Sequence, residues 1–187
     1  MDSFYTQAEL EQLGLKRYGK NVKISRKASL YGCDKMEFGD NVRIDDFCFL
    51  MGKLIFGNYI HIAPYCYITG GDEGVYFEDF AGFSFRVSAF TRSDDYSGMT
   101  LTNPTVPEKY KPMLTKKELR IGKHAIVGAG SIIMPGAHLE EGVAVGAFSL
   151  INKPTKPWGI YVGTPATLHR ARKRELLKLE AEFLQER

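Results

Sequence analysis

The chain has 187 residues, of which 44% are hydrophobic and 25% charged, which predicts one soluble globular domain with at most a small appendage. No run of about 18 apolar residues occurs, so no membrane span is expected. The net charge of +3 is too small to favour a nucleic-acid partner. The N-terminus has no basic start or apolar stretch, and the three cysteines form no CxxC pair. Both features favour a cytoplasmic protein with reduced thiols.

Residues 1–20 predict a short N-terminal helical segment over one end of the domain. Ser3 or Thr6 is the expected helix cap, because a side-chain oxygen there accepts a hydrogen bond from a free N–H group of the first turn.

Residues 21–153 carry an internal repeat of six residues. Large apolar residues recur every six positions in two unbroken series, and mostly small residues stand four places after them. The first series is Phe38, Ile44, Leu50, Phe56, Ile62 and Ile68, and the second is Ile121, Val127, Ile133, Leu139, Val145 and Ile151. A period of six fits a short strand followed by a turn, with two inward side chains per repeat, and fits neither an amphipathic helix nor an alternating strand. The repeat therefore predicts an all-β solenoid of triangular coils that stack at ~4.8 Å.

Residues 90–120 interrupt the repeat between two blocks that are otherwise in phase. So long an insertion in a compact domain is usually functional or disordered. Tyr96, Tyr110 and the prolines favour an ordered, extruded loop. Phe90, Met99 and Leu101 add apolar surface that a single solenoid cannot bury, so we expect this arm to lie against a neighbouring copy of the chain.

Residues 154–187 leave the solenoid through Pro154 and Pro157 and predict a tail with a C-terminal α-helix. Thr164 as the N-cap and Pro165 as the first helical residue form a start signal for this helix. Its apolar stripe is expected to pack against the solenoid or a neighbouring subunit. The stripe consists of Leu176, Leu179 and Phe183.

The hexads, the segment IGKHAIVGAGSIIMPGAHLEEGVAVGAFSLINKP and the later YVGTPA resemble the hexapeptide-repeat acyltransferases. Within that group the chain is similar to the galactoside and maltose acetyltransferase-like and polysaccharide O-acetyltransferase branch, over about residues 20–170. The resemblance implies a left-handed parallel β-helix and a homotrimer with active sites between subunits. It also implies a transferase, without a metal, that moves acetyl from acetyl-CoA to a sugar hydroxyl in surface polysaccharide or sugar metabolism.

The resemblance also points to the cofactor groove. Small residues in the second apolar series, which starts at Ile121, would let the backbone approach an extended ligand. Gly128 and Gly146 are among these small residues. The implied cofactor-binding residues are Ala129, Ala147, Asn152, Lys153, Pro165 and Arg170. Thr167 departs from relatives that carry a second arginine at that place.

The relatives carry a catalytic histidine in the extruded loop, but none of the four histidines of this chain lies there. Asp94 stands at the matching position, so Asp94 and its neighbour Asp95 are the candidate general bases. Such a role requires burial or a like charge to raise the pKa of the carboxyl group. Asp72 matches an acceptor-binding position, and Arg86 and Tyr96 are further candidates for contact with the sugar. Turn formation is the alternative role for the aspartates.

Two other functions remain open at this point. An amine acceptor needs less help from a base, so N-acetylation of an amino sugar, including a nucleotide-linked one, is the alternative reaction. An inactive trimeric scaffold is the alternative outside enzymes. The sequence identifies neither the acceptor nor an acyl group beyond acetyl, and it leaves His61 and His124 as other bases to test.

Overall fold

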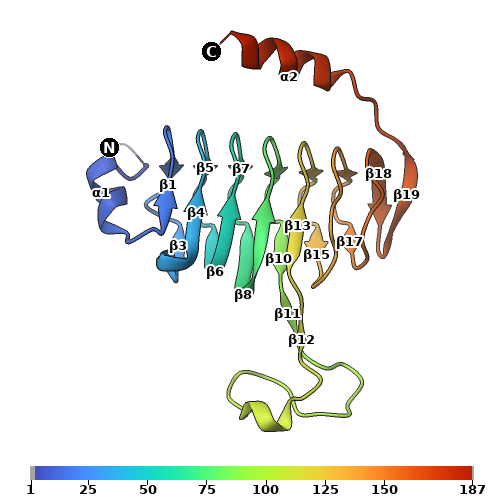
Figure 1. The fold of residues 1–187 in the computed structure, drawn as a ribbon. Helices are drawn as coiled ribbons and strands as arrows, with labels where there is room; N and C mark the ends of the chain where they lie inside the picture. Colours follow the sequence, from blue (N-terminus) through green and yellow to red (C-terminus); the bar gives the residue numbers. More distant parts are fainter. Residues whose placement is uncertain (1–2, 187) are drawn as a thin grey trace.

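The computed structural model describes residues 3–186, which form a parallel β-solenoid with an arm on one side and a helix at the C-terminal end (Figure 1). In chain order the helices and strands are α1 (Gln7–Gln12), β1 (Arg17–Tyr18), β2 (Lys23–Ile24), β3 (Ser29–Tyr31), β4 (Met36–Phe38), β5 (Arg43–Ile44), β6 (Phe49–Phe56), β7 (His61–Ile62), β8 (Tyr67–Phe77), β9 (Gly82–Phe83), β10 (Ser88–Phe90), β11 (Arg92–Ser93), β12 (Thr115–Lys116), β13 (Leu119–Ile121), β14 (Ile126–Val127), β15 (Ile132–Ile133), β16 (Ala144–Val145), β17 (Leu150–Ile151), β18 (Gly159–Gly163), β19 (Ala166–Ala171) and α2 (Leu176–Gln185). Short 3₁₀ helices span Cys33–Lys35 and Glu108–Tyr110.

The strands of the solenoid make three faces in the described part of the chain. The β7 face contains β2, β5, β7, β9, β14, β16 and β18 in that order, all parallel. The β10 face contains β3, the starts of β6 and β8, and then β10, β15 and β17. The β13 face contains β1, β4, the ends of β6 and β8, and β13. Because β1 and β18 join these faces, the solenoid is longer at both ends than the predicted 21–153.

Two long strands turn a corner between the β10 and β13 faces. The pairing of β6 with β8 is irregular around Gly52. Gly52 has a φ of 80°, and a Cβ atom there would lie 2.6 Å from the carbonyl oxygen of Gly71. Only glycine fits this corner, because it tolerates a positive φ and has no side chain to meet the next coil.

The repeat places the core as the sequence predicts. No residue of the two large apolar series is more than 4% exposed. The small companion positions are also buried, and they include Cys48 and Cys66, whose thiols donate to the carbonyl oxygens of Ala63 and Ser84. Each coil is therefore filled by one large and one small side chain per face, and these two cysteines are part of the core.

The N-terminal helix has the predicted cap at Thr6. The Thr6 hydroxyl accepts from the N–H of Glu9, and the Glu9 carboxylate accepts from the N–H of Thr6, which is a reciprocal capping box. Leu10 is 1% exposed, and it anchors α1 on the first coil.

The predicted start of the C-terminal helix is wrong. Thr164 and Pro165, joined by a cis peptide bond, lie in the turn between β18 and β19, which pair antiparallel. The Thr164 hydroxyl donates to the carbonyl oxygen of Phe148 and caps no helix. A Thr-Pro pair fits a connection between strands as well as a helix start. Because β19 pairs with β18 of the last coil, the pair here forms the connection between these two strands. The helix begins later, at Leu176.

Helix α2 runs back along the solenoid from its C-terminal end (Figure 1). The Glu180 carboxylate pairs with His124 Nε2 at 2.9 Å and with Lys123 Nζ at 2.5 Å. The Phe183 ring packs against the rings of Tyr59 and Phe80 in an edge-to-face arrangement, with an interplanar angle of 76° in both pairs. The predicted packing against the solenoid is thus confirmed for Phe183, whereas Leu179 is 64% exposed. Neither α2 nor any other helix between residues 3 and 186 is long and apolar enough to cross a membrane.

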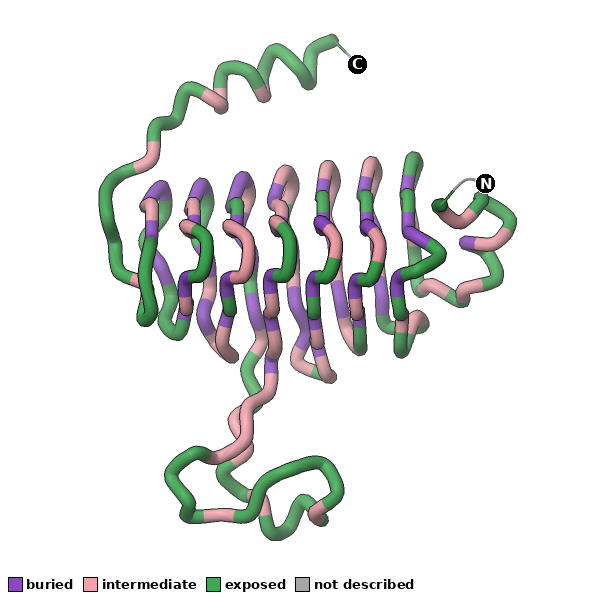
Figure 2. Tube along the Cα trace, turned by 180° about the vertical axis from the view of Figure 1, so that it is seen from behind, coloured by how far each residue is buried: buried purple, intermediate pink, exposed green. Residues whose placement is uncertain are grey.

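The arm leaves the solenoid after β10 and returns at β13, which confirms the extruded loop (Figures 1 and 2). Its base is the antiparallel pair β11 and β12. Arg92 at this base donates to the carboxylates of Glu73 and Asp72 at 3.0 and 3.1 Å. Figure 2 shows that most of the arm beyond this base is exposed.

Candidate active site

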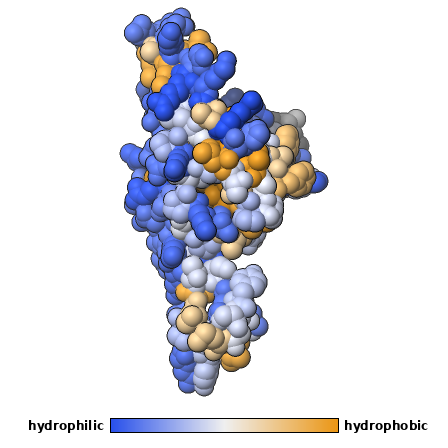
Figure 3. Space-filling model, turned by 90° about the vertical axis from the view of Figure 1, so that its right-hand side faces the viewer, coloured by the Kyte–Doolittle hydropathy of each residue, from blue (hydrophilic) through white to orange (hydrophobic). Residues whose placement is uncertain are grey.

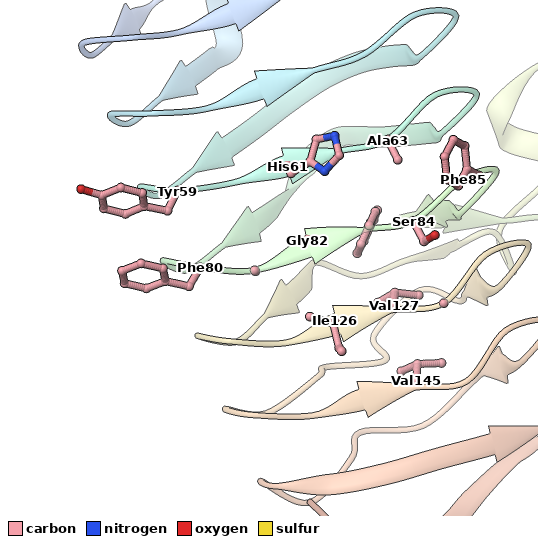
Figure 4. A pocket seen from close by; sticks show the side chains of 13 residues that line it. Tyr59, His61, Ala63, Phe80, Gly82, Ser84, Phe85, Ile126, Val127 and Val145 are labelled. Carbon is pink, nitrogen blue, oxygen red and sulfur yellow. The ribbon is translucent and has the colours of Figure 1, made fainter. Parts of the chain in front are cut away.

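A hollow of about 500 Å³ lies on the β7 face (Figure 4). His61, Gly82 and Ile126 stand side by side on β7, β9 and β14. The next outward row continues this register with Ala63, Ser84 and Gly128. Small side chains between larger ones leave the depression, which we call the β7-face hollow.

Ser84 is the polar residue of the second row, and the sequence reasoning did not select it. Its side chain is partly exposed and lines the β7-face hollow, close to the corner that leads to the β10 face. The signal was available in principle, since Ser84 directly follows the inward Phe83 as Gly128 follows Val127. Seeing it required the register between coils that are 21 rather than 18 residues apart.

His61 enters the same hollow from β7 and is paired at its back with Asp45. His61 Nε2 lies 2.7 Å from Asp45 Oδ2, and Arg43 Nε lies 2.6 Å from Asp45 Oδ1. The Asp45 side chain is only 11% exposed, whereas that of His61 is 55% exposed. The carboxylate is thus fixed, and the imidazole faces the solvent side of the hollow.

Asp94 lies in a second hollow, of about 490 Å³, which is formed by the arm. We call it the arm hollow, and Arg92 and Lys111 also line it. The Asp94 carboxylate accepts a hydrogen bond from the N–H of Asn103 at 3.3 Å. A partly exposed carboxylate in such a hollow can accept hydrogen bonds from a bound donor group. In one chain, Asp94 and Ser84 line different hollows.

Asp95 does not have the environment expected of a base. Its carboxylate accepts from the N–H groups of Ser97, Met99 and Thr100 and from two hydroxyls. These bonds, with that of the Ser97 hydroxyl first, lower the pKa of Asp95 to about 2. The sequence argument required a raised pKa, so it fails for Asp95, and the contacts are those of a residue that closes a turn.

The three predicted acceptor-binding residues lie apart from one another. Asp72 pairs with Lys35 at 2.8 Å and with Arg92, and the hydrogen bond from Lys35 is the main cause of its lowered pKa. Arg86 lies over the Tyr65 ring, at the corner between the β7 and β10 faces. Tyr96 is 91% exposed on the arm. A single chain therefore offers no shared sugar site made of these three.

The predicted cofactor residues fall at two corners and on the last hairpin. Ala129, Ala147 and Pro165 follow β14, β16 and β18 at one corner of successive coils. Asn152 and Lys153 follow β17, at the opposite edge of the β10 face, and Arg170 is exposed on β19. Figure 3 views this end of the molecule and shows hydrophobic surface between α2 and the arm.

Exposed aromatic side chains form two columns on the coils of β3, β6 and β8, in the N-terminal half of the solenoid. On the β10 face, the Phe49 ring stacks on Tyr67 with centroids 4.7 Å apart and lies tilted against Tyr31 at 5.0 Å. At the adjoining corner, Phe47 stacks on Tyr65 at 5.0 Å. These five side chains are partly or largely exposed to solvent in the single chain.

Two sets of known proteins resemble this chain over its length. The dTDP-4-amino-4,6-dideoxy-D-glucose acyltransferase of Escherichia coli is 41% identical over 184 residues, which are 97% of this chain and 95% of that protein. AntD, an N-acyltransferase from Bacillus cereus, is 45% identical over 100% of both chains. Its D94A mutant with dTDP and coenzyme A has a TM-score of 0.98 to this structure. Its S84A mutant, with dTDP-4-amino-4,6-dideoxyglucose and coenzyme A, also has a TM-score of 0.98. No family model matches the chain.

These relatives correct the predicted reaction. AntD transfers an acyl group to nitrogen, and the E. coli relative is named for an amino sugar. The prediction of O-acetyl transfer to a sugar hydroxyl is therefore wrong, as is the assignment to the galactoside and maltose branch. The alternative reaction, on a nucleotide-linked amino sugar, agrees with both relatives. The chain belongs to the hexapeptide-repeat β-helix acyltransferases, in one family with these dTDP-amino-sugar acyltransferases.

Proposed function

We propose that this protein is an N-acyltransferase that moves an acyl group from acyl-CoA to the amino group of dTDP-4-amino-4,6-dideoxyglucose. The observation that carries the proposal is the full-length likeness to AntD, whose S84A mutant binds this nucleotide sugar together with coenzyme A. This chain has a serine at 84 and an aspartate at 94, the two numbers at which the AntD mutants are changed.

The reaction needs an amine, a thioester and a route for protons. The amine nitrogen attacks the thioester carbonyl carbon, the C–N bond forms, and the C–S bond breaks to release coenzyme A. We assign Asp94 to the acceptor amine, as a carboxylate that accepts its hydrogen bond and takes a proton from the ammonium form. Ser84 is assigned to hydrogen bonding with the reacting groups in the β7-face hollow.

We assign the acyl-CoA groove to the corner that carries Ala129, Ala147 and Pro165, where small residues leave room for an extended pantetheine chain. Lys153 and Arg170 are assigned to the phosphates, because charge-assisted bonds to phosphate are the stronger kind. Asn152 stays a candidate for the adenine portion. AntD also binds 3-hydroxybutyryl-CoA, so the acyl group of this protein is either acetyl or a longer one.

We further propose a homotrimer in which the arm of one chain lies against its neighbour. Two features support it: the exposed aromatic columns, and the separation of Ser84 and Asp94 into different hollows of one chain. A neighbour's arm would bring an Asp94 to the β7-face hollow. Light scattering that finds a stable monomer at micromolar concentration would contradict this assembly. The cytoplasmic location stays a prediction, and a dTDP-sugar substrate is compatible with it.

The test of the reaction is an assay of thiol release with two matched acceptors. The purified protein is mixed with acetyl-CoA or 3-hydroxybutyryl-CoA and with either dTDP-4-amino-4,6-dideoxyglucose or dTDP-glucose, which lacks the amine. We expect free coenzyme A and an amide product only with the amino sugar, and a preference between the two thioesters. Equal turnover with dTDP-glucose, or none with the amino sugar, would overturn the proposal.

A further inference from the structure

His61 is held in one orientation by a neighbour on the preceding coil. Its Nε2 atom lies 2.7 Å from Asp45 Oδ2, and the other oxygen of Asp45 is paired with Arg43. Because Asp45 is buried and paired on both oxygens, the carboxylate is an anchor for the imidazole and not itself a ligand group. A histidine ring fixed in this way by a carboxylate is the arrangement that fixes the tautomer in acyl-transfer enzymes.

The second ring nitrogen, Nδ1, has no hydrogen-bond partner within residues 3–186. When Nε2 donates its proton to Asp45, Nδ1 carries a lone pair and accepts protons. The ring lies at the wall of the β7-face hollow, as Figure 4 shows. Its neighbour in register on the next strand is Gly82, which has no side chain to cover it.

Ser84 stands diagonally across the hollow from His61. One strand spacing of ~4.8 Å and two residues of rise at ~3.3 Å separate their backbone positions by ~8 Å. The two side chains thus flank a space that one small reacting group can fill. Apart from His61, the described residues that line this hollow carry no imidazole, carboxylate or amine, so His61 is the base that this hollow offers within one chain.

We propose that His61, oriented by Asp45, is a further catalytic residue that carries a proton from the acceptor nitrogen to the sulfur of the leaving group. The inference rests on the proposed function. An ammonium acceptor loses one proton before it attacks and a second as the amide forms, and Asp94 is assigned to the first. As the C–N bond forms and the C–S bond breaks, the second proton moves to His61 Nδ1. The imidazolium then gives it to the thiolate, so His61 ends neutral and free coenzyme A leaves as the thiol.

The first experiment compares His61→Gln with His169→Gln in the full-length protein. His169 is exposed on β19 and serves as the matched control. The wild-type rate with the amino sugar is measured first, because its absence would count against the proposed function and not against His61. We expect His61→Gln to lower kcat by roughly 100-fold or more, with the KM for both substrates, the Kd for coenzyme A and the melting temperature nearly unchanged. His169→Gln should match the wild type.

The second experiment separates proton transfer from a structural role. In His61→Gly, added imidazole should restore part of kcat, because a free base can occupy the vacated space. Asp45→Asn should lower kcat, and the double variant with His61→Gln should be no slower than His61→Gln alone, since both residues act as one unit. A His61→Gln rate within about threefold of wild type would overturn the proposal. So would a slow His61→Gly that imidazole leaves unchanged, or additive losses in the double variant.

Discussion

Replacing Ser131 with alanine should destabilise the corner that carries the proposed acyl-CoA edge. Ser131 is fully buried at a companion position of the repeat. Its hydroxyl donates to the carbonyl oxygen of Gly146 at 2.9 Å and accepts from the N–H of Ser149 at 3.1 Å. Alanine leaves both backbone groups without this partner in a site closed to water. Each stranded group costs about 1–3 kcal/mol, so for the two groups we expect a loss of about 2–6 kcal/mol.

The measurement is thermal unfolding followed by circular dichroism. For a chain of this size, such a loss corresponds to a decrease of about 4–24 °C in Tm. The control is Ser29→Ala on β3, where the serine is exposed and a change within about 0.5 kcal/mol is expected. If Ser131→Ala melts within 2 °C of the wild type, by the same ~2–4 °C per kcal/mol scale, then the hydroxyl does not carry this part of the corner, and the hydrogen-bond reasoning is refuted.

Three further predictions concern binding, turnover and pH. Ala147→Trp should block the proposed acyl-CoA groove by its bulk, and Arg170→Ala should remove a phosphate contact worth roughly 1.5–3 kcal/mol. Both variants should therefore raise the Kd for coenzyme A in calorimetry while the Tm stays nearly constant. Unchanged binding in both variants would mean that the groove lies elsewhere. Asp94→Asn should lower kcat by less than the ~10²–10⁴-fold expected for an indispensable base, because an amine is nucleophilic once neutral. A decrease of that full size in steady-state kinetics would refute this prediction. The hydrogen bond from Arg26 is the main cause that lowers the pKa of Glu9 from 4.5 to about 2. Glu9 therefore adds stability above pH 4.5 that is lost as the pH falls towards 2. In Glu9→Gln, the free energy of unfolding measured by urea titration should depend less on pH between pH 5 and 2 than in the wild type.

The core could be predicted from the sequence because its spacing is a property of the coil itself. Each hexad puts the same two positions inward, so Ile62 and Cys66 could be assigned to the interior without any knowledge of their neighbours. The helix start at Thr164 could not be predicted in this way. The same two residue types serve a helix cap and a strand connection, and only the pairing of β19 with β18 decides between them.

The site was harder to predict because its parts meet across coils. His61 and Asp45 are 16 residues apart, and their pairing follows from the stacking of β7 on β5. Asp95 illustrates the opposite case. Its adjacency to Asp94 implies a raised pKa, but a loop of five donors around the carboxylate reverses the direction. The positions of the outward residues were predictable, whereas their partners depended on the register.

The insertion of the arm leaves the stacking order of the solenoid strands unbroken. The coil that ends in β10 is followed directly by the coil that starts in β13, since β13 stacks on β8 and β15 stacks on β10. At the arm's base, Arg92 stands opposite Lys116, so the two points where the chain leaves and re-enters are neighbours. An insertion closed at its own base places little demand on the core. In this architecture, the segment that carries Asp94 can therefore be lengthened, shortened or exchanged during evolution while the coils keep their stacking. If the proposed division of the site holds, the arm that would meet the acceptor can change independently of the coils that would bind the acyl-CoA.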